Sequence, residues 1–160
     1  MKLDFAHHGV VLMTRVDYIK LILQEVPEDM RNGTTATLAG NHLFKVNKTD
    51  PDELSSMQAE VFVHIIMQLL YLSQRARPDI RTAVSFLCSW LNRPDKDNYK
   101  KLCWVIKYLH GTLDLPLKLS GDGTGIIRWW IDASFGVHAD MKGHTGGTLS
   151  RFIVRPPNKS

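Results

Sequence analysis

The sequence predicts an α+β fold in which an N-terminal β-hairpin and a three-helix body precede a set of antiparallel strands. Apolar residues recur at helical spacing in several stretches up to Gly111, and after Pro116 the apolar period changes to two. A glycine-containing turn, His7-His8-Gly9, separates two short segments with apolar residues near the N-terminus. With 160 residues and 44% hydrophobic content, the chain can bury a modest core.

The first residues are predicted to form the hairpin and then a short helix. Two short segments, the alternating Leu3-Asp4-Phe5 and the apolar Val10-Val11-Leu12-Met13, flank a turn whose glycine can adopt the positive φ that tight turns need. Thr14 and Asp17 have the spacing of a capping box, and the helical period that follows lasts until Pro27. A helix is therefore expected directly after the hairpin.

A polar segment, residues 28–49, separates this helix from the body. It is rich in Gly, Thr and Asn, so we expect a connecting loop that touches the core at few places. Its predicted anchors are the apolar residues Leu43, Phe44 and Val46.

Three helices make up the predicted body. Asp50-Pro51-Asp52-Glu53 combines a cap acceptor, a first-turn proline and carboxylates near the positive helix end, so a long central helix is expected to begin there. Pro78 begins the second helix and Arg93-Pro94 ends it, and the third runs from near Asp95 to Gly111. The central helix has the widest apolar stripe: Leu54, Met57, Val61, Phe62, Ile65, Ile66, Leu69 and Leu72.

The C-terminal part is predicted to consist of antiparallel strands. Leu117 and Leu119, then Ile126 to Phe135, then Thr145 to Val154 alternate or run apolar around glycine-rich turns. Their edges suggest one functional alternative, in which strands between Gly125 and Val154 pair with a partner protein or with a second copy.

Composition excludes several classes of protein. No apolar run approaches the roughly 20 residues that span a bilayer, and the N-terminus lacks a secretory signal pattern. We therefore expect a soluble protein of the cytoplasm or nucleus, neither secreted nor bound to a membrane. Cys88 and Cys103 are too few for a disulfide framework or a four-cysteine zinc site, so both are expected to be buried reduced thiols. A formal charge of +4 permits contact with nucleic acid.

Several short blocks, taken in their order, resemble one family. Asp132 follows the apolar run Trp129-Trp130-Ile131, and upstream lie Arg75-Ala76-Arg77-Pro78-Asp79-Ile80 and Ile106-Lys107-Tyr108-Leu109-His110-Gly111. The chain resembles the Pol polyprotein of copia-class LTR retrotransposons where the reverse transcriptase ends and ribonuclease H begins. The matching blocks are Met1 to Phe5, Asn41 to Phe44, Leu70 to Leu87, Tyr99 to Leu117 and Trp129 to Gly147.

The resemblance implies two domains with different ancestral roles. Residues 1–115 would correspond to the C-terminal, thumb- or connection-like region of the reverse transcriptase. Residues 116–160 would correspond to a truncated ribonuclease H domain, with its sheet incomplete.

The resemblance also implies chemistry based on magnesium, most of whose ligands this chain lacks. Polymerisation and ribonuclease H cleavage both use two metal ions held by several carboxylates. The sequence has no Asp-Asp pair, and the family's palm would lie before Met1. Asp132 resembles the first ribonuclease H carboxylate, but Ser134 stands where the family has a second aspartate, and Ile131 replaces a small residue.

We therefore expect no catalysis and no cofactor in this chain, although the intact family enzyme uses Mg²⁺. Asp132 would be a vestigial catalytic and metal-binding residue in an incomplete site, or else a strand-end residue that caps a turn. In another alternative, sequence not present here completes an active polymerase and ribonuclease H.

Other residue types that can bind metals occur in less specific patterns. Asp140, the pair His138 and His144, and His7-His8 are each interpreted as turn or loop residues, because no third convergent ligand accompanies them. The sequence also lacks a Gly-x-Ser-x-Gly elbow and a phosphate-binding Gly-x-x-x-x-Gly-Lys loop.

A basic and aromatic helix face is the main candidate for binding. Lys100, Trp104 and Lys107 recur at helical spacing with Lys101 alongside, so lysines could contact phosphates while the indole stacks on a sugar or base. In the alternative, the face is solvated and the loop of residues 28–49 covers Trp104.

A second basic cluster begins the second body helix. It consists of Arg75, Arg77 and Arg81, which could contact phosphates or could form a salt-bridged helix end. Together the two clusters predict weak, sequence-independent binding to RNA or DNA duplexes, weakened by salt.

Overall fold

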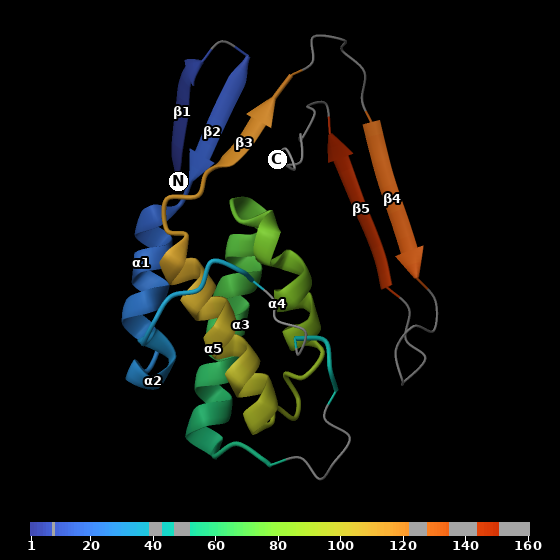
Figure 1. Ribbon diagram of the computed structural model, residues 1–160. Helices are drawn as coiled ribbons and strands as arrows, with labels where there is room; N and C mark the ends of the chain where they lie inside the picture. Colours follow the sequence, from blue (N-terminus) through green and yellow to red (C-terminus); the bar gives the residue numbers. More distant parts are fainter. Residues whose placement is uncertain (8, 39–42, 47–51, 122–127, 135–143, 151–160) are drawn as a thin grey trace. The chain divides into compact units, whose positions relative to one another are not determined.

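The computed structural model describes residues 1–7, 9–38, 43–46, 52–121, 128–134 and 144–150 (Figure 1). Helices and antiparallel strands are both present, which confirms the predicted α+β class. Contacts divide the chain into two compact units. The helical unit holds Met1–Lys2 and Met13–Leu117, and the strand unit holds Leu3–Leu12 and the described residues from Lys118 onward. The functional division between residues 115 and 116 stays a prediction.

The predicted N-terminal hairpin is present and gains a third strand from far along the chain. β1 (Lys2–His7) pairs with β2 (Val10–Thr14), and β2 also pairs with β3 (Leu117–Ser120). Gly9 has a φ of 72°, which a side chain would strain, and its carbonyl accepts a hydrogen bond from the Gly121 N–H at 3.2 Å.

Two short helices follow the hairpin. α1 (Val16–Glu25) begins after Arg15, and no side chain caps it, so the predicted Thr14–Asp17 capping box is wrong. α2 (Glu28–Arg31) lies in the segment expected to be loop. It forms there because Met30 is fully buried and the Arg31 side chain donates to the Val26 carbonyl at 2.9 Å, contacts that no local pattern indicated.

The central helix of the body is α3 (Ser56–Arg75), and it begins later than predicted. Ser55 caps it by accepting from the Gln58 N–H, while Gln58 accepts from the Ser55 N–H. The helix start predicted at Asp50-Pro51-Asp52-Glu53 is wrong for Asp52 and Glu53, while Asp50 and Pro51 lie outside the described residues. The Asp52 carbonyl accepts from the Lys96 N–H at 2.9 Å, and Glu53 forms an antiparallel bridge with Asp95, so this segment is held in extended pairing with the start of the last helix.

The remaining helices follow the predicted order. η1 (Pro78–Ile80) leads into α4 (Arg81–Cys88), which ends before the predicted Arg93. α5 (Lys96–Gly111) starts after Asp95, whose carboxylate accepts from the Asn98 N–H at 2.7 Å. Buried side chains of α1, α3, η1, α4 and α5 share one core, whose members include Ile19, Ile22, Phe62, Ile65, Ile66, Leu69, Leu72, Ile80, Val84, Leu87, Leu102, Val105, Ile106 and Leu109.

A segment that we call the strap, residues 33–38, crosses α5 and is drawn in cyan in Figure 1. The Thr35 N–H donates to the Lys107 carbonyl at 3.2 Å. A Cβ atom on Gly111 would lie only 2.8 Å from the Thr35 carbonyl oxygen, so glycine is needed for this close approach. Beyond the strap, Leu43 is buried as predicted. Phe44 is about half exposed but packs edge-on against the core residue Phe86, with ring centres 5.6 Å apart, whereas Val46 is exposed.

Two further strands form a separate antiparallel pair. β4 (Arg128–Ser134) pairs with β5 (His144–Ser150), with Ile131 opposite Gly147 and Asp132 opposite Gly146. Asp132 lies two residues before the end of β4, so within the described strand it is an internal residue and not the terminal one. None of the described helices is both long and apolar enough to cross a membrane.

Candidate nucleic-acid interface

The strap occupies the aromatic part of the predicted binding face on α5. The Trp104 indole N–H donates to the Thr37 carbonyl at 2.9 Å, and the side chain is half-buried. The sequence alternative, in which residues of the 28–49 segment cover Trp104, describes what the structure shows.

Lys101 is part of the protein interior and not of an exposed face. It is 1% exposed, and its ammonium donates to the Lys45 carbonyl and to the Asp97 carboxylate, 2.7 Å away. The ammonium also lies 5.1 Å from the centre of the Phe86 ring. The prediction that Lys101 is available to phosphate is therefore wrong in this structure, because its donors already have partners.

Arg77 is likewise committed to internal contacts. It is 2% exposed and donates to the Asp79 carboxylate at 2.8 Å and to the Thr112 carbonyl at 2.9 Å. Tyr108 donates to the same carboxylate at 2.9 Å, so the network joins the end of α3 to the end of α5. The salt-bridged helix end, the second interpretation of this cluster, is therefore what Arg77 forms.

The other predicted cations are exposed in part but lie apart. Lys100, Arg75 and Arg81 are exposed, while Lys107 is half-buried with its methylenes near Gly33. Arg75 ends α3, next to the C-terminal end of α5 through the Arg77–Thr112 bond. Lys100 stands eleven residues before that end, roughly 17 Å along the helix axis. The structure therefore does not gather these cations into one patch.

A different group, the arginine–tyrosine cluster of Arg15, Tyr18, Tyr71 and Arg75, collects cations and aromatic rings. The guanidinium carbons of Arg15 and Arg75 lie 5.2 and 5.8 Å from the centre of the Tyr71 ring. The Tyr18 ring packs edge-on against Tyr71 with centres 5.5 Å apart, and Arg15 donates to the Tyr71 hydroxyl at 3.2 Å. Two guanidinium groups thus share one aromatic ring.

In the part of the chain that the structure describes, the cluster carries positive charge without a paired carboxylate. Among the ion pairs of the described residues, none includes Arg15 or Arg75. The Arg15 Nε is buried and has no hydrogen-bond partner in the described part of the chain. Burial raises the pKa of Tyr18 above 10.0, and Tyr71 raises it further while Arg15 opposes the shift, so the phenol stays neutral near pH 7.

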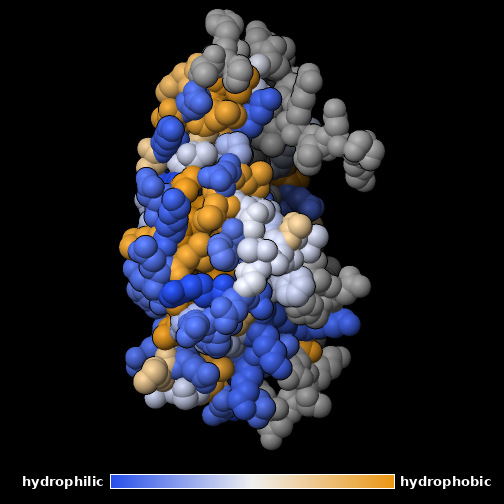
Figure 2. Space-filling view, turned by 60° about the vertical axis from the view of Figure 1, so that its left-hand side comes forward, coloured by the Kyte–Doolittle hydropathy of each residue, from blue (hydrophilic) through white to orange (hydrophobic). Residues whose placement is uncertain are grey.

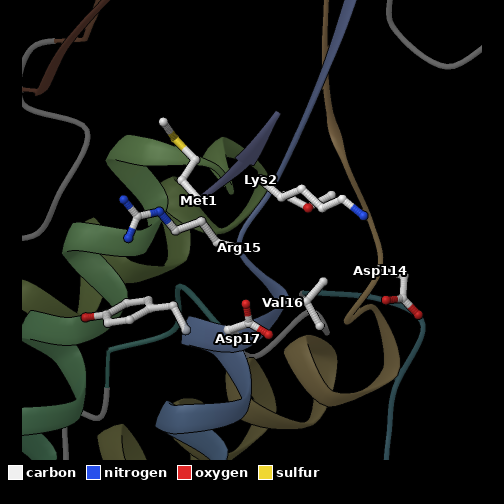
Figure 3. A pocket seen from close by; sticks show the side chains of 8 residues that line it. Met1, Lys2, Arg15, Val16, Asp17 and Asp114 are labelled. Atoms are coloured by element: carbon white, nitrogen blue, oxygen red, sulfur yellow. The ribbon is translucent and has the colours of Figure 1, made fainter. Parts of the chain in front are cut away.

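An open pocket of about 490 Å³ adjoins the cluster. In Figure 3, Arg15 and Met1 lie on one side of it, and Lys2 and Asp114 lie on the other. Asp17 also lines the pocket, so its charges are mixed and the excess of cations lies in the cluster itself. Figure 2 shows hydrophobic side chains among hydrophilic ones on the face that carries α1. In the helical unit, the exposed apolar residues include Leu21, Met67 and Tyr71.

Of the four residues in this cluster, Arg75 was the one predicted from the sequence as a candidate for binding. Tyr71 and Arg75 stand four residues apart in a predicted helix, and this i, i+4 spacing is visible in the sequence. Arg15 is fifty-six residues from Tyr71, and no local pattern brings the two together.

The predicted metal site has no support among the described residues. Asp132 is exposed, and no group of three or more His, Cys, Asp or Glu side chains converges on a point in that part of the chain. His8, His138 and Asp140 lie outside the described residues. His7 ends β1 and His144 begins β5. Cys88 and Cys103 are free thiols, half-buried where full burial was expected.

Comparisons with known proteins give two informative relatives. The chain is 26% identical over 143 residues to the retrovirus-related Pol polyprotein from transposon TNT 1-94 of Nicotiana tabacum, covering 88% of the chain and 11% of that protein. It is 26% identical over 150 residues to a transposon Ty5-1 protein of Saccharomyces cerevisiae, covering 93% of the chain and 47% of that protein.

The chain thus spans about a tenth of one relative and about half of the other. No family model matches it, and no solved structure matches it significantly. Nearly the whole chain aligns with both transposon proteins, which confirms the predicted resemblance to retrotransposon Pol polyproteins. The position at the junction of reverse transcriptase and ribonuclease H stays a prediction. The chain is therefore similar, over nearly its whole length, to a segment of retrotransposon Pol polyproteins.

Proposed function

We propose that the chain derives from a copia-type Pol polyprotein, at the junction of reverse transcriptase and ribonuclease H, and binds nucleic acid without sequence preference or catalysis. The arginine–tyrosine cluster carries the binding part of this proposal. It presents two guanidinium groups that have no carboxylate partner among the described residues, beside the half-exposed Tyr71 ring.

Nucleic acid matches this chemistry in two ways. Guanidinium groups bind phosphate oxygens with paired hydrogen bonds and displace condensed counterions, which is favourable for any sequence. A tyrosine ring can stack on a base or sugar regardless of base identity. The formal net charge of +4 adds long-range attraction for a polyanion.

The proposed lack of catalysis rests on a count of oxygen ligands. Two-metal phosphodiester chemistry requires several carboxylates that converge on the ions. The sequence contains no Asp-Asp pair, and Asp132 is the carboxylate that matches the ribonuclease H pattern, with Ser134 at the following motif position. Mg²⁺ would belong to the intact family enzyme.

A charge-removal experiment tests the binding surface. We expect Arg15→Gln combined with Arg75→Gln to weaken binding to a fluorescent 20-base-pair duplex at least tenfold. The slope of log affinity against log salt should fall by about two, one for each lost phosphate contact. Fluorescence anisotropy at several salt concentrations measures both quantities.

The matched control removes two charges from the helix face that the sequence favoured. Lys100→Gln with Lys107→Gln lowers the net charge equally and should cost much less affinity. Equal affinity of the arginine variant and the parent chain would refute the cluster as the site. Circular dichroism establishes that each variant is folded, and Tyr71→Phe, which keeps the ring, should keep most of the affinity.

A second candidate function is that the chain forms one part of an active Pol polyprotein. This candidate is favoured by the small share of the relatives' length that the chain covers, 11% and 47%. The flanking genomic DNA decides between the two. An upstream reading frame with an adjacent Asp pair and a downstream one with the missing carboxylates would support the active enzyme. Stop codons on both sides would exclude it.

A further inference from the structure

β4 carries three consecutive large apolar side chains that are mostly exposed. Trp129, Trp130 and Ile131 are 66%, 65% and 73% exposed. Within the described residues β4 has one strand neighbour, β5, and a two-stranded ribbon alone is only marginally stable in water. The other edge of β4 therefore presents unpaired backbone groups in this part of the chain.

The pairing with β5 does not bury these side chains. Ile131 stands opposite Gly147 and Asp132 opposite Gly146, so β5 contributes no side chain at these two positions. Trp129 stands opposite Leu149 and Trp130 opposite Thr148, and both tryptophans are nevertheless about two thirds exposed. β4 also lacks the lysine or proline with which proteins usually protect an edge. The strand is therefore suited to pair with a further strand.

The order of residues along β4 identifies that strand. The first five residues of β4 are Arg128-Trp129-Trp130-Ile131-Asp132. Trp130 is at the centre, a large apolar residue stands on each side of it, and the two ends carry opposite charges. We propose that β4 pairs antiparallel with β4 of a second copy of this chain, with the twofold axis at Trp130. The inference is independent of nucleic-acid binding, because it uses none of the arginine–tyrosine cluster.

This register satisfies each cross-strand position. Arg128 of one copy lies opposite Asp132 of the other, twice by symmetry, and Trp129 lies opposite Ile131. On the same face as the two charge pairs, Trp130 meets its own symmetry mate. A parallel in-register pairing would instead set Arg128 against Arg128 and Asp132 against Asp132. The two local ion pairs also offset part of the repulsion between two chains of charge +4.

Charge reversals distinguish pairing in this register from non-specific hydrophobic association. We expect Asp132→Lys and Arg128→Asp each to weaken dimerisation about tenfold or more in sedimentation velocity, because each creates two like-charge pairs. The two changes shift net charge in opposite directions. If net charge alone governed association, Arg128→Asp would strengthen it. Lys20→Asp, an equal charge change on an exposed residue of α1, is the matched control and should have little effect.

A mixture of the two variants tests the proposed register most directly. A chain with Arg128→Asp has two aspartates on the edge, and a chain with Asp132→Lys has two cations. The mixture should form a heterodimer at concentrations where each variant alone is a monomer, which also proves that both variants are folded. Failure of the mixture to associate, unchanged dimerisation of the single variants, or a parent chain that stays monomeric would each overturn the proposal. Large aggregates that form equally in the parent chain and in the charge-reversal variants would indicate non-specific hydrophobic association and would also overturn the proposal.

Discussion

Arg77 and Lys101 are cations whose N–H donors have been taken up by the protein's own acceptors. Such groups are costly to bury, and they stay stable only while their partners remain in place. Both hold segments that are distant in sequence, Arg77 through Thr112 and Lys101 through Lys45. At the scale of single residues, their charge therefore serves the fold.

Removal of the Arg77 side chain tests this role. Arg77→Ala leaves Asp79 with fewer donors and the Thr112 carbonyl without its partner, so we expect a loss of about 2 to 4 kcal/mol in the free energy of unfolding. Urea denaturation followed by circular dichroism measures the change. Arg75→Ala, the exposed neighbour, should change the free energy by less than about 1 kcal/mol. Similar losses for both would contradict a special role of Arg77.

Cys103 offers a second test at this scale. Burial, and next the nearby Asp29, raise the pKa of its thiol from 9.0 to about 11, so the reactive thiolate is scarce at pH 8. We expect alkylation by iodoacetamide at pH 8 about a hundredfold slower than for an ordinary thiol, from the two-unit difference alone. Mass spectrometry of timed samples measures the rate, and full rates should return in urea. Fast labelling of the folded protein would disprove the burial.

At the scale of elements, contacts between distant segments decide where helices begin and what covers them. The hairpin, α4 and α5 were predictable because their signals are local: a turn glycine, a proline start and an aspartate cap. The start of α3 was not predictable, because the Lys96 N–H binds the Asp52 carbonyl and the helix begins only after Ser55. The buried state of Lys101 depends on a carbonyl fifty-six residues away. The arginine–tyrosine cluster escaped prediction for the same reason.

The strap's approach to α5 predicts an unusual response at Gly111. Glycine to alanine within a helix ordinarily stabilises by about 1 kcal/mol. Here the added Cβ would meet the Thr35 carbonyl at 2.8 Å, so we expect Gly111→Ala to destabilise by about 1 to 3 kcal/mol. The urea midpoint gives the sign, with Gln74→Ala as an exposed helical control. Stabilisation by Gly111→Ala would show that the strap moves aside easily.

The contact between α1 and α3 predicts an acid dependence. Hydrogen bonds from Gln68 and then His64 lower the pKa of Glu25 below its ordinary 4.5. Because the folded value is the lower one, the stabilisation is present above pH 4.5 and is lost as pH falls through the folded pKa. We expect the urea midpoint to decline with pH in this acid range, and less steeply for Glu25→Gln. The same substitution at exposed Glu60 should leave the decline unchanged.

At the scale of the whole molecule, the two units differ in how much they bury. The helical unit has one continuous core, whereas β4 exposes three large apolar residues. The change from helices to strands follows the change of apolar period that the sequence shows near residue 116. The inclusion of Leu3–Leu12 in the strand unit could not be predicted, because strand partners are not encoded locally.

Amide exchange should report this difference. We expect the amides of β4 and β5 to exchange much faster than those of Ile65, Leu69 and Leu72 in α3, because few buried contacts resist opening of the strand pair. Hydrogen–deuterium exchange read by mass spectrometry at low protein concentration measures both regions. Protection in β4 that rises with concentration would agree with pairing between copies. Equal protection in both regions at high dilution would contradict the expected weakness of the strand pair.

The three-stranded sheet imposes an order of events during synthesis. β1 and β2 leave the ribosome well before β3, the strand that completes their sheet, which ends only at Ser120, after every described helix has been made. The newborn hairpin must therefore remain one strand short while translation continues, a period in which chaperones can reach its open side. A slow codon placed after residue 120 would prolong this vulnerable interval less than one placed at residue 60.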